Sequence, residues 1–268
     1  MIKVQVLLST YNGESFLGQQ LDSVLLQHGV EIRCLIRDDG STDNTVNIIK
    51  RYASENKNIS YILGDNIGYK KSFMELLKHA DKTCEYYAFC DQDDVWFENK
   101  ITKAIETLER CFDKDKPNLY YSNLNIVDEN LVFINQLFDK DLNYSSWKKQ
   151  MLQCRCYGCT MVLNNKAWNV INMHQPIRTF AHDYWIPFLV LVVGNTIYDK
   201  NAYIFYRQHE KNAIGAYRSL MTQLKLNIHT AGEHYDLLKS VLLYREILNK
   251  DIIEEFEEIL RYKKSLKI

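Results

Sequence analysis

The chain has 268 residues, 46% of them hydrophobic and 25% charged, so it can bury a sizeable core as one large domain or as a domain with an appendage. A net charge of -1 argues against bulk nucleic-acid binding, and only 3 prolines and 10 glycines argue against long disordered linkers. The start MIKVQVLLSTYNGE does not resemble a signal peptide, and the longest apolar run, residues 185–194, is about half of what spans a bilayer. We therefore expect a cytoplasmic protein.

The N-terminal part of the chain repeats one pattern, in which a β-rich run is followed by a polar turn and then by helical spacing. The predicted strands cover residues 3–9, 32–37, 60–64 and 86–90. The predicted helices cover residues 15–27, 44–55, 72–80 and 98–112. Strands that alternate with helices indicate an α/β protein with a largely parallel sheet and helices on both faces.

The second half is less regular. We predict strands within residues 117–130, 157–164 and 202–212, and a loop followed by a buried helix over residues 179–193. From about Ser219 onward the pattern is helical and amphipathic, and the last stretch, RYKKSLKI, is basic.

Polar residues stand directly after three of the predicted strands. They are Thr10, Asp38 and Asp91. The carboxyl ends of parallel strands meet at one edge of a sheet, and ligands bind outside that edge. The three local patterns therefore predict a single crevice.

In the stretch YYAFCDQDDVWF, a predicted apolar strand is followed directly by three acidic residues, Asp91, Asp93 and Asp94. Carboxylates this close repel each other and raise each other's pKa unless a positive charge lies among them. One interpretation is a site for a divalent cation, because Mg²⁺ takes one or two carboxylates together with substrate phosphates. The alternative is that the acidic residues cap a helix that begins near Val95.

Seven short motifs occur in order along the chain: LLSTYNGESFL, IRDDGSTDNT, DNIGYKKSF, FCDQDDVWFENKI, GCTMVLN, HDYW and YRQHEKN. Together they resemble the family 2 glycosyltransferases of the GT-A fold, and within them the rhamnosyltransferase-like branch that builds bacterial surface polysaccharides. The resemblance covers residues 2–215 and departs from the branch at Ser72, where an asparagine is common. It implies a GT-A domain over 1–215, with a nucleotide-binding half over about 1–112 and an acceptor half over about 113–215, and a helical extension over 216–268.

The resemblance implies a binding site for a nucleotide sugar. Its expected residues are Thr10, Tyr11, Glu14, Asp38, Asp39, Asn66, Gly68, Lys71, Asp91, Gln92, Gly158, Cys159 and Arg207. Thr10, Tyr11 and Glu14 would hold the base and ribose. Asp38 would accept a hydrogen bond from a pyrimidine ring nitrogen, and Arg207 would lie in a late loop that closes on the diphosphate.

The resemblance also assigns the catalytic and metal-binding roles. Asp183 matches the catalytic base, while Asp93 of the DxD motif and His209 would bind Mn²⁺ or Mg²⁺. An inverting transfer needs one base and no covalent intermediate, so no activated serine or cysteine is expected. Read without the family, Asp183 is an N-cap of the buried helix, and Arg207 and His209 are surface residues past a strand end.

We expect a metal-dependent inverting glycosyltransferase that takes a nucleoside-diphosphate sugar, first of all dTDP-rhamnose, and a glycan acceptor on a lipid carrier. The rival functions are a sugar-1-phosphate nucleotidyltransferase and a non-catalytic nucleotide-binding scaffold. The helices after Ser219 would attach the enzyme peripherally to the inner membrane face, or pack against the domain, or form a homodimer. No nucleic-acid partner is expected.

Overall fold

The computed structural model describes residues 1–138, 146–152, 155–209 and 231–265. The strands are β1 (Ile2–Thr10), β2 (Val30–Asp38), β3 (Ile59–Leu63), β4 (Tyr86–Cys90), β5 (Val95–Trp96), β6 (Asn118–Val127), β7 (Phe133–Gln136), β8 (Val162–Asn164) and β9 (Asn195–Arg207). The α-helices are α1 (Leu17–Leu25), α2 (Thr45–Glu55), α3 (Tyr69–His79), α4 (Lys100–Cys111), α5 (Trp147–Leu152), α6 (Asn165–Ile171), α7 (His182–Val193), α9 (Ala231–Val241) and α10 (Lys250–Ser265). Two 3₁₀ turns, η1 (Gly158–Thr160) and η2 (Leu242–Tyr244), complete the described elements.

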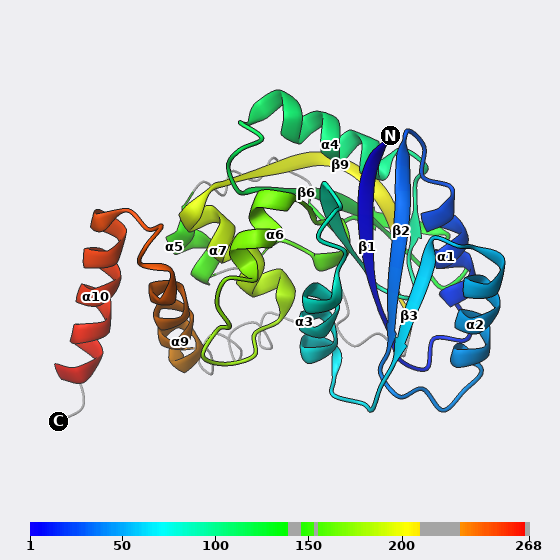
Figure 1. Cartoon of the computed structure of the whole chain (residues 1–268), viewed down its shortest axis with the longest axis horizontal. Helices are drawn as coiled ribbons and strands as arrows, with labels where there is room; N and C mark the ends of the chain where they lie inside the picture. Colours follow the sequence, from blue (N-terminus) through cyan, green and yellow to red (C-terminus); the bar gives the residue numbers. More distant parts are fainter. Residues whose placement is uncertain (139–145, 153–154, 210–230, 266–268) are drawn as a thin grey trace.

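One mixed sheet runs through the molecule (Figure 1). Its order within the described residues is β3-β2-β1-β4-β8-β6-β9-β5, with β7 paired to the side of β6. The pairs among β1, β2, β3 and β4 are parallel, as the strand–helix alternation predicts, whereas β8 pairs antiparallel with both β4 and β6. The α/β prediction with a mostly parallel mixed sheet is therefore confirmed.

Helices cover both faces of this sheet (Figure 1). The side chains of β1 pack alternately on the two faces of the sheet, because successive residues of a strand point in opposite directions. Val4, Val6 and Leu8 pack in a core with residues of α1, α2 and α4. Leu7 lies in the other core, which is formed with α3, α6, α7 and α9.

Helix α7 is apolar on nearly all sides and is buried, which confirms the prediction over residues 179–193. Its first residue is His182, and Ala181 occupies the N-cap position. Trp185, Phe188 and Leu189 have no exposed surface. The helix therefore holds its first turn rigidly beside the sheet.

The acidic turn after β4 does not cap a helix at Val95, so that alternative is wrong. Val95 and Trp96 form the short strand β5, which pairs antiparallel with β9, and α4 begins only at Lys100. A β-branched residue followed by aromatic residues favours a strand, and pairing with β9 satisfies its backbone. The acidic turn thus connects two strands of one sheet.

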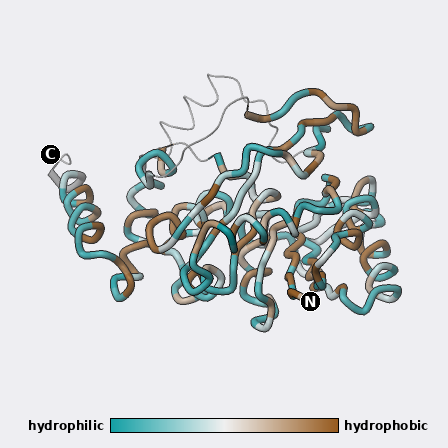
Figure 2. The backbone as a smooth tube through the Cα atoms, turned by 90° about the horizontal axis from the view of Figure 1, so that it is seen from above, coloured by the Kyte–Doolittle hydropathy of each residue, from teal (hydrophilic) through white to brown (hydrophobic). Residues whose placement is uncertain are grey.

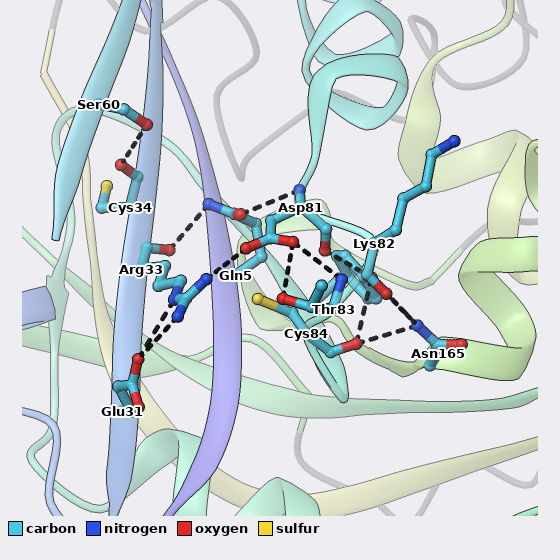
Figure 3. Close-up of polar contacts among 11 residues, drawn as sticks. Gln5, Glu31, Arg33, Cys34, Ser60, Asp81, Lys82, Thr83, Cys84 and Asn165 are labelled. Atoms are coloured by element: carbon cyan, nitrogen blue, oxygen red, sulfur yellow. Dashed lines mark hydrogen bonds and ion pairs between the residues drawn. The ribbon is translucent and has the colours of Figure 1, made fainter.

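A polar network surrounds the turn between α3 and β4 (Figure 3). Arg33 forms ion pairs with Asp81 and Glu31, and the Gln5 side chain donates to the Arg33 carbonyl at 3.0 Å. The Asn165 amide donates to the carbonyl of Cys84 at 2.9 Å. These contacts join the turn before β4 to β1, β2 and the start of α6.

The C-terminal helices pack against the domain. Leu237, Leu238 and Val241 of α9 and Phe256 of α10 are fully buried in the same core as α7. Hydrophobic and hydrophilic residues alternate along α10, at the end of the molecule far from β3 (Figure 2). Residues 219–230, where the predicted amphipathic pattern begins, lie outside the described residues. Within the described part of the chain, no helix is long and apolar enough to cross a membrane.

Candidate active site

The three expected strand ends align at the carboxyl edge of the parallel strands. Thr10 and Asp38 are register partners at the ends of β1 and β2. Cys90, the last residue of β4, pairs with Leu8, so Asp91 emerges at the same edge. The structure therefore brings together the three strand ends that the sequence pattern singled out.

Gln92 ties the acidic turn to the end of β1. Its Oε1 accepts hydrogen bonds from Thr10 Oγ1 at 2.6 Å and from the Tyr11 backbone N–H at 2.8 Å. Its Nε2 donates to the Tyr11 carbonyl at 3.2 Å. A Cβ added at Gly13 would lie 2.4 Å from this Oε1 and 2.8 Å from Thr10 Oγ1, so glycine leaves room for this contact. Gln92 and Thr10 thus position the turn as one unit.

The acidic turn crowds carboxylates into a largely buried space. A ligand atom each from Asp91, Asp94 and Cys159 lies within 4.8 Å of the others. Burial, followed by the charges of Asp93 and Asp183, raises the pKa of Asp91 to about 7. Burial also raises the pKa of the Cys159 thiol well above its usual value, so this cysteine stays protonated and is no nucleophile. The arrangement suits an oxygen-seeking cation better than a thiolate reaction.

His209 contacts the acidic turn directly. Its Nε2 lies 2.8 Å from Asp93 Oδ2, and its ring packs 4.7 Å from the ring of Phe16. Both side chains of the pair are largely buried, at 7% exposed for His209 and 12% for Asp93. The two residues that the family resemblance assigns to the metal therefore face each other.

Arg207 also lies in the site, where its guanidinium donates hydrogen bonds to protein oxygens. Its Nε donates to the carbonyl of Asp93 at 2.8 Å, its Nη2 to Gln19 Oε1 at 2.5 Å, and its Nη1 to the carbonyl of Glu129. The residue is only 2% exposed, and its backbone N–H donates to Asp94 Oδ1 at 3.2 Å. Arg207 is thus not a surface residue past a strand end; in this structure it holds the backbone of the acidic turn.

Asp183 lies in the first turn of α7 and is partly buried. It is not the N-cap of the helix, because that position belongs to Ala181. Its charge contributes, after burial and Asp93, to the raised pKa of Asp91, so the two carboxyl groups lie near one another. A negative charge in the first turn of a helix is stabilised by the helix dipole.

His182, beside Asp183, is a buried neutral imidazole. Its ring packs 3.9 Å from Phe73 and 4.8 Å from Phe89, and burial lowers its pKa to about 3. A Cβ added at Gly158 would lie only 2.0 Å from His182 Nε2. The turn that carries Cys159 and the helix start that carries Asp183 therefore interlock through a glycine and a histidine.

A buried ion pair joins the end of β2 to the loop before α3. Arg37 pairs with Asp39 and donates to the Asp65 carbonyl and to Ser72 Oγ, each at 3.1 Å. The Asp39 carboxylate also accepts from the backbone N–H of Gly68 at 2.8 Å. The sequence placed Asp39 among the binding residues but did not single out Arg37, although a charged residue within an apolar strand was the available signal. Ser72, where the sequence departs from the branch, is part of this network.

The remaining expected contacts vary in accessibility. Asp38 is 2% exposed and accepts from the backbone N–H groups of Gly40 and Ser41, so its carboxylate braces its own turn. Glu14 accepts from the backbone N–H of Asn44 at 2.9 Å, at the start of α2. Three other expected residues, Asn66, Gly68 and Lys71, lie exposed on the loop and first turn of α3, beside the crevice.

Comparison with known proteins gives the family of this site. The profile of Glycosyl transferase family 2 matches residues 5–170. The dTDP-rhamnosyl transferase RfbG of Shigella flexneri is 30% identical over 229 residues, which span 81% of this chain and 77% of that protein. An uncharacterized glycosyltransferase of Rickettsia typhi is 26% identical over 77% of this chain, and this chain spans 64% of its length.

Solved structures show the same fold. TarS of S. aureus, residues 1-349 in complex with UDP-GlcNAc, superposes with a TM-score of 0.62 at 16% identity, over 95% of this chain and 71% of that one. A mannosyltransferase of Pyrobaculum calidifontis, in complex with GDP-Man and Mn²⁺, gives a TM-score of 0.56 at 14% identity, over 98% and 79%. The expected GT-A fold is confirmed, and the chain belongs to glycosyl transferase family 2.

Proposed function

We propose that this glycosyltransferase is metal-dependent and inverting, and that it moves a sugar from a nucleoside diphosphate to a hydroxyl of a glycan acceptor. One observation carries this proposal. The acidic turn after β4 lies close to Asp183 at the start of α7, since burial, then Asp93, then Asp183 raise the pKa of Asp91. An inverting transfer needs these two groups on opposite sides of one reacting carbon.

The residues present fit a divalent cation. Asp93 and His209 would hold it, with Asp91 close by, and carboxylate and imidazole ligands suit Mn²⁺ or Mg²⁺. Asp94 Oδ2 is a buried oxygen that has no hydrogen-bond partner among the described residues, and burial with the charges of Asp93 and Asp91 raises the pKa of Asp94 well above its usual value. The protonated Cys159 thiol does not join the ligands. A bound cation would neutralise the diphosphate charge that develops as the leaving group departs.

The protein supplies the proton transfer and the geometry. Asp183 would accept the proton of the acceptor hydroxyl, whose oxygen then bonds to the anomeric carbon while the bond from that carbon to the diphosphate breaks. Arg207 would stabilise the developing charge from its place behind the acidic turn, since it donates to the Asp93 backbone. Buried cysteines take no part, because the transfer needs no covalent intermediate.

The donor that the comparisons favour is dTDP-rhamnose, because a dTDP-rhamnosyl transferase is 30% identical to this chain. The acceptor would be a growing surface glycan on a lipid carrier, which would bring the enzyme to the inner membrane face. Family membership argues against a nucleotidyltransferase. A non-catalytic scaffold is disfavoured because Asp93, His209 and Asp183 are all gathered in the crevice.

The first experiment is calorimetric titration of dTDP, UDP, GDP and their sugar conjugates into the protein, with Mn²⁺ and then with chelator. Chelator-sensitive binding supports the metal site, and the nucleotide sugar that binds most tightly identifies the donor. Proton NMR of the product formed from that donor then gives the anomeric configuration. Retention of configuration, or binding that is indifferent to chelator, would overturn the proposal.

A further inference from the structure

Lys100, the first residue of α4, is a buried cation that the mechanism above does not use. It is 1% exposed, and its Nζ has neither a hydrogen-bond partner nor an ion pair among the described residues. The ammonium lies 3.9 Å from the centre of the Trp96 ring, which offers it a cation–π contact. Burial lowers its pKa to about 8, so the group remains charged at pH 7.

This position is unfavourable for a lysine in two ways. A buried ammonium without a hydrogen-bonding partner loses its hydration, and a cation–π contact restores only part of that loss. A positive charge on the first residue of a helix also meets the positive end of the helix dipole. An apolar side chain would suit the site better, because Ile101, Ala104 and Ile105 continue the same buried stripe of α4. The charge itself therefore needs an explanation.

The surroundings of Lys100 supply one. Trp96, over whose ring the ammonium lies, comes two residues after Asp94 in the chain, so Lys100 lies close to the acidic turn. The Asp94 side chain is 1% exposed, its Oδ2 has no hydrogen-bond partner among the described residues, and burial with the charges of Asp93 and Asp91 raises its pKa well above the usual value. The other neighbours are Cys90 and Cys159, whose thiols stay neutral because burial raises their pKa. Lys100 thus lies near the acidic turn, whose Asp93 carbonyl also accepts a hydrogen bond from Arg207.

We propose that Lys100 is a positioning residue that supplies a resident positive charge near the acidic turn and thereby holds down the affinity of the empty site for a divalent cation. Before substrate binds, this charge offsets the repulsion among the carboxylates and keeps the turn in place. Because it also opposes an incoming cation, the ion is held firmly only when the donor's diphosphate adds negative charge. The inference rests on the proposed metal-dependent function.

The test compares Lys100→Met with Lys103→Met. Lys103 is on the same helix, with its side chain 44% exposed and paired to Glu106, so its loss changes the net charge equally without touching the turn. The Mn²⁺ dissociation constant is measured at pH 7 by electron paramagnetic resonance, first with Mn²⁺ alone and then with dTDP. Circular dichroism confirms the fold, and Lys100→Gln carries the same test if Lys100→Met does not fold.

Removing the resident charge should tighten Mn²⁺ binding to the free protein about tenfold or more, whereas Lys103→Met should change it less than about twofold. If Lys100 were merely structural, its replacement would weaken Mn²⁺ binding, because a loosened turn binds the ion less tightly. Wild-type binding of Mn²⁺ with dTDP, together with unchanged or weaker binding in the Lys100 variants, would overturn this inference alone. Failure of every protein to bind Mn²⁺, even with dTDP, would overturn both the inference and the metal-dependent function.

Discussion

His209 Nε2 lies 2.8 Å from Asp93 Oδ2, although 116 residues separate the two in sequence. The contact follows from strand pairing, because β5, directly after the acidic turn, pairs antiparallel with β9, which ends just before His209. Phe205 is the register partner of Val95, so the polar residues beyond each strand meet. The proposed metal ligands thus owe their geometry to a long-range pairing.

Asp93→Ala should abolish transfer and the metal-dependent binding of nucleotide, because it removes a carboxylate ligand and the partner of His209. Calorimetry with Mn²⁺ and dTDP, beside a transfer assay, measures both effects. Asp115→Ala is the matched control, since that carboxylate is 70% exposed and distant in sequence from the turn. Full activity of Asp93→Ala with Mg²⁺ would refute the metal assignment.

Asp183→Asn should leave donor affinity nearly unchanged and lower kcat by about 10²–10⁴-fold, the usual contribution of a general base. The amide keeps the shape of the side chain at the start of α7 but cannot accept the acceptor's proton. Steady-state kinetics and donor titration separate the two effects. If donor binding collapses with turnover, the role of Asp183 is structural.

Gly158→Ala should destabilise the fold by about 1–3 kcal/mol and lower kcat, because the added Cβ would lie 2.0 Å from His182 Nε2. The displaced imidazole would shift the adjoining Asp183. Gly232→Ala is the control, since nothing lies within 4 Å of a Cβ there. Adding His182→Ala should relieve part of the defect, and chemical denaturation measures the coupling between the two sites. Strictly additive losses would contradict the interlock.

Arg37→Met should cost about 3–5 kcal/mol, because it leaves Asp39 buried without its ion-pair partner. The loop before α3 should loosen with it and raise the KM for the donor. Arg33→Met, on the same strand, breaks ion pairs in which the arginine is 35% exposed and should lower the melting temperature less (Figure 3). Equal shifts in the two variants would show that burial of the Arg37 pair is unimportant.

The buried His182 should make the protein less stable in acid. Its pKa is about 3 in the folded state, against about 6.5 when unfolded, so between these values only the unfolded chain binds the proton. Its contribution is therefore complete above pH 6.5 and declines by about 1.4 kcal/mol for each unit as the pH falls toward 3. Urea denaturation from pH 7 to 4 should show a shallower dependence for His182→Leu than for the wild type. Parallel curves would mean that the imidazole is hydrated.

The sequence was most informative where the physics is local. Alternating strands and helices predicted the sheet, and the polar residues after β1, β2 and β4 predicted its working edge. It misled at Val95, where a helix start was considered, because the pairing of β5 with β9 involves residues more than a hundred positions away. A charge inside an apolar pattern marked Arg37 and Lys100 as unusual, but their partners could not be predicted, since these come from segments distant in the sequence.

The packing of the C-terminal helices against the domain limits how they can take part in membrane attachment. Leu237, Leu238 and Val241 of α9 and Phe256 of α10 complete the core around α7, on which Asp183 sits. These side chains cannot also enter a lipid surface, because their release would expose the core and loosen the start of α7. A chain shortened after residue 215 should therefore aggregate or lose turnover, and any attachment to a bilayer has to use groups that this core leaves uncovered, such as Tyr262.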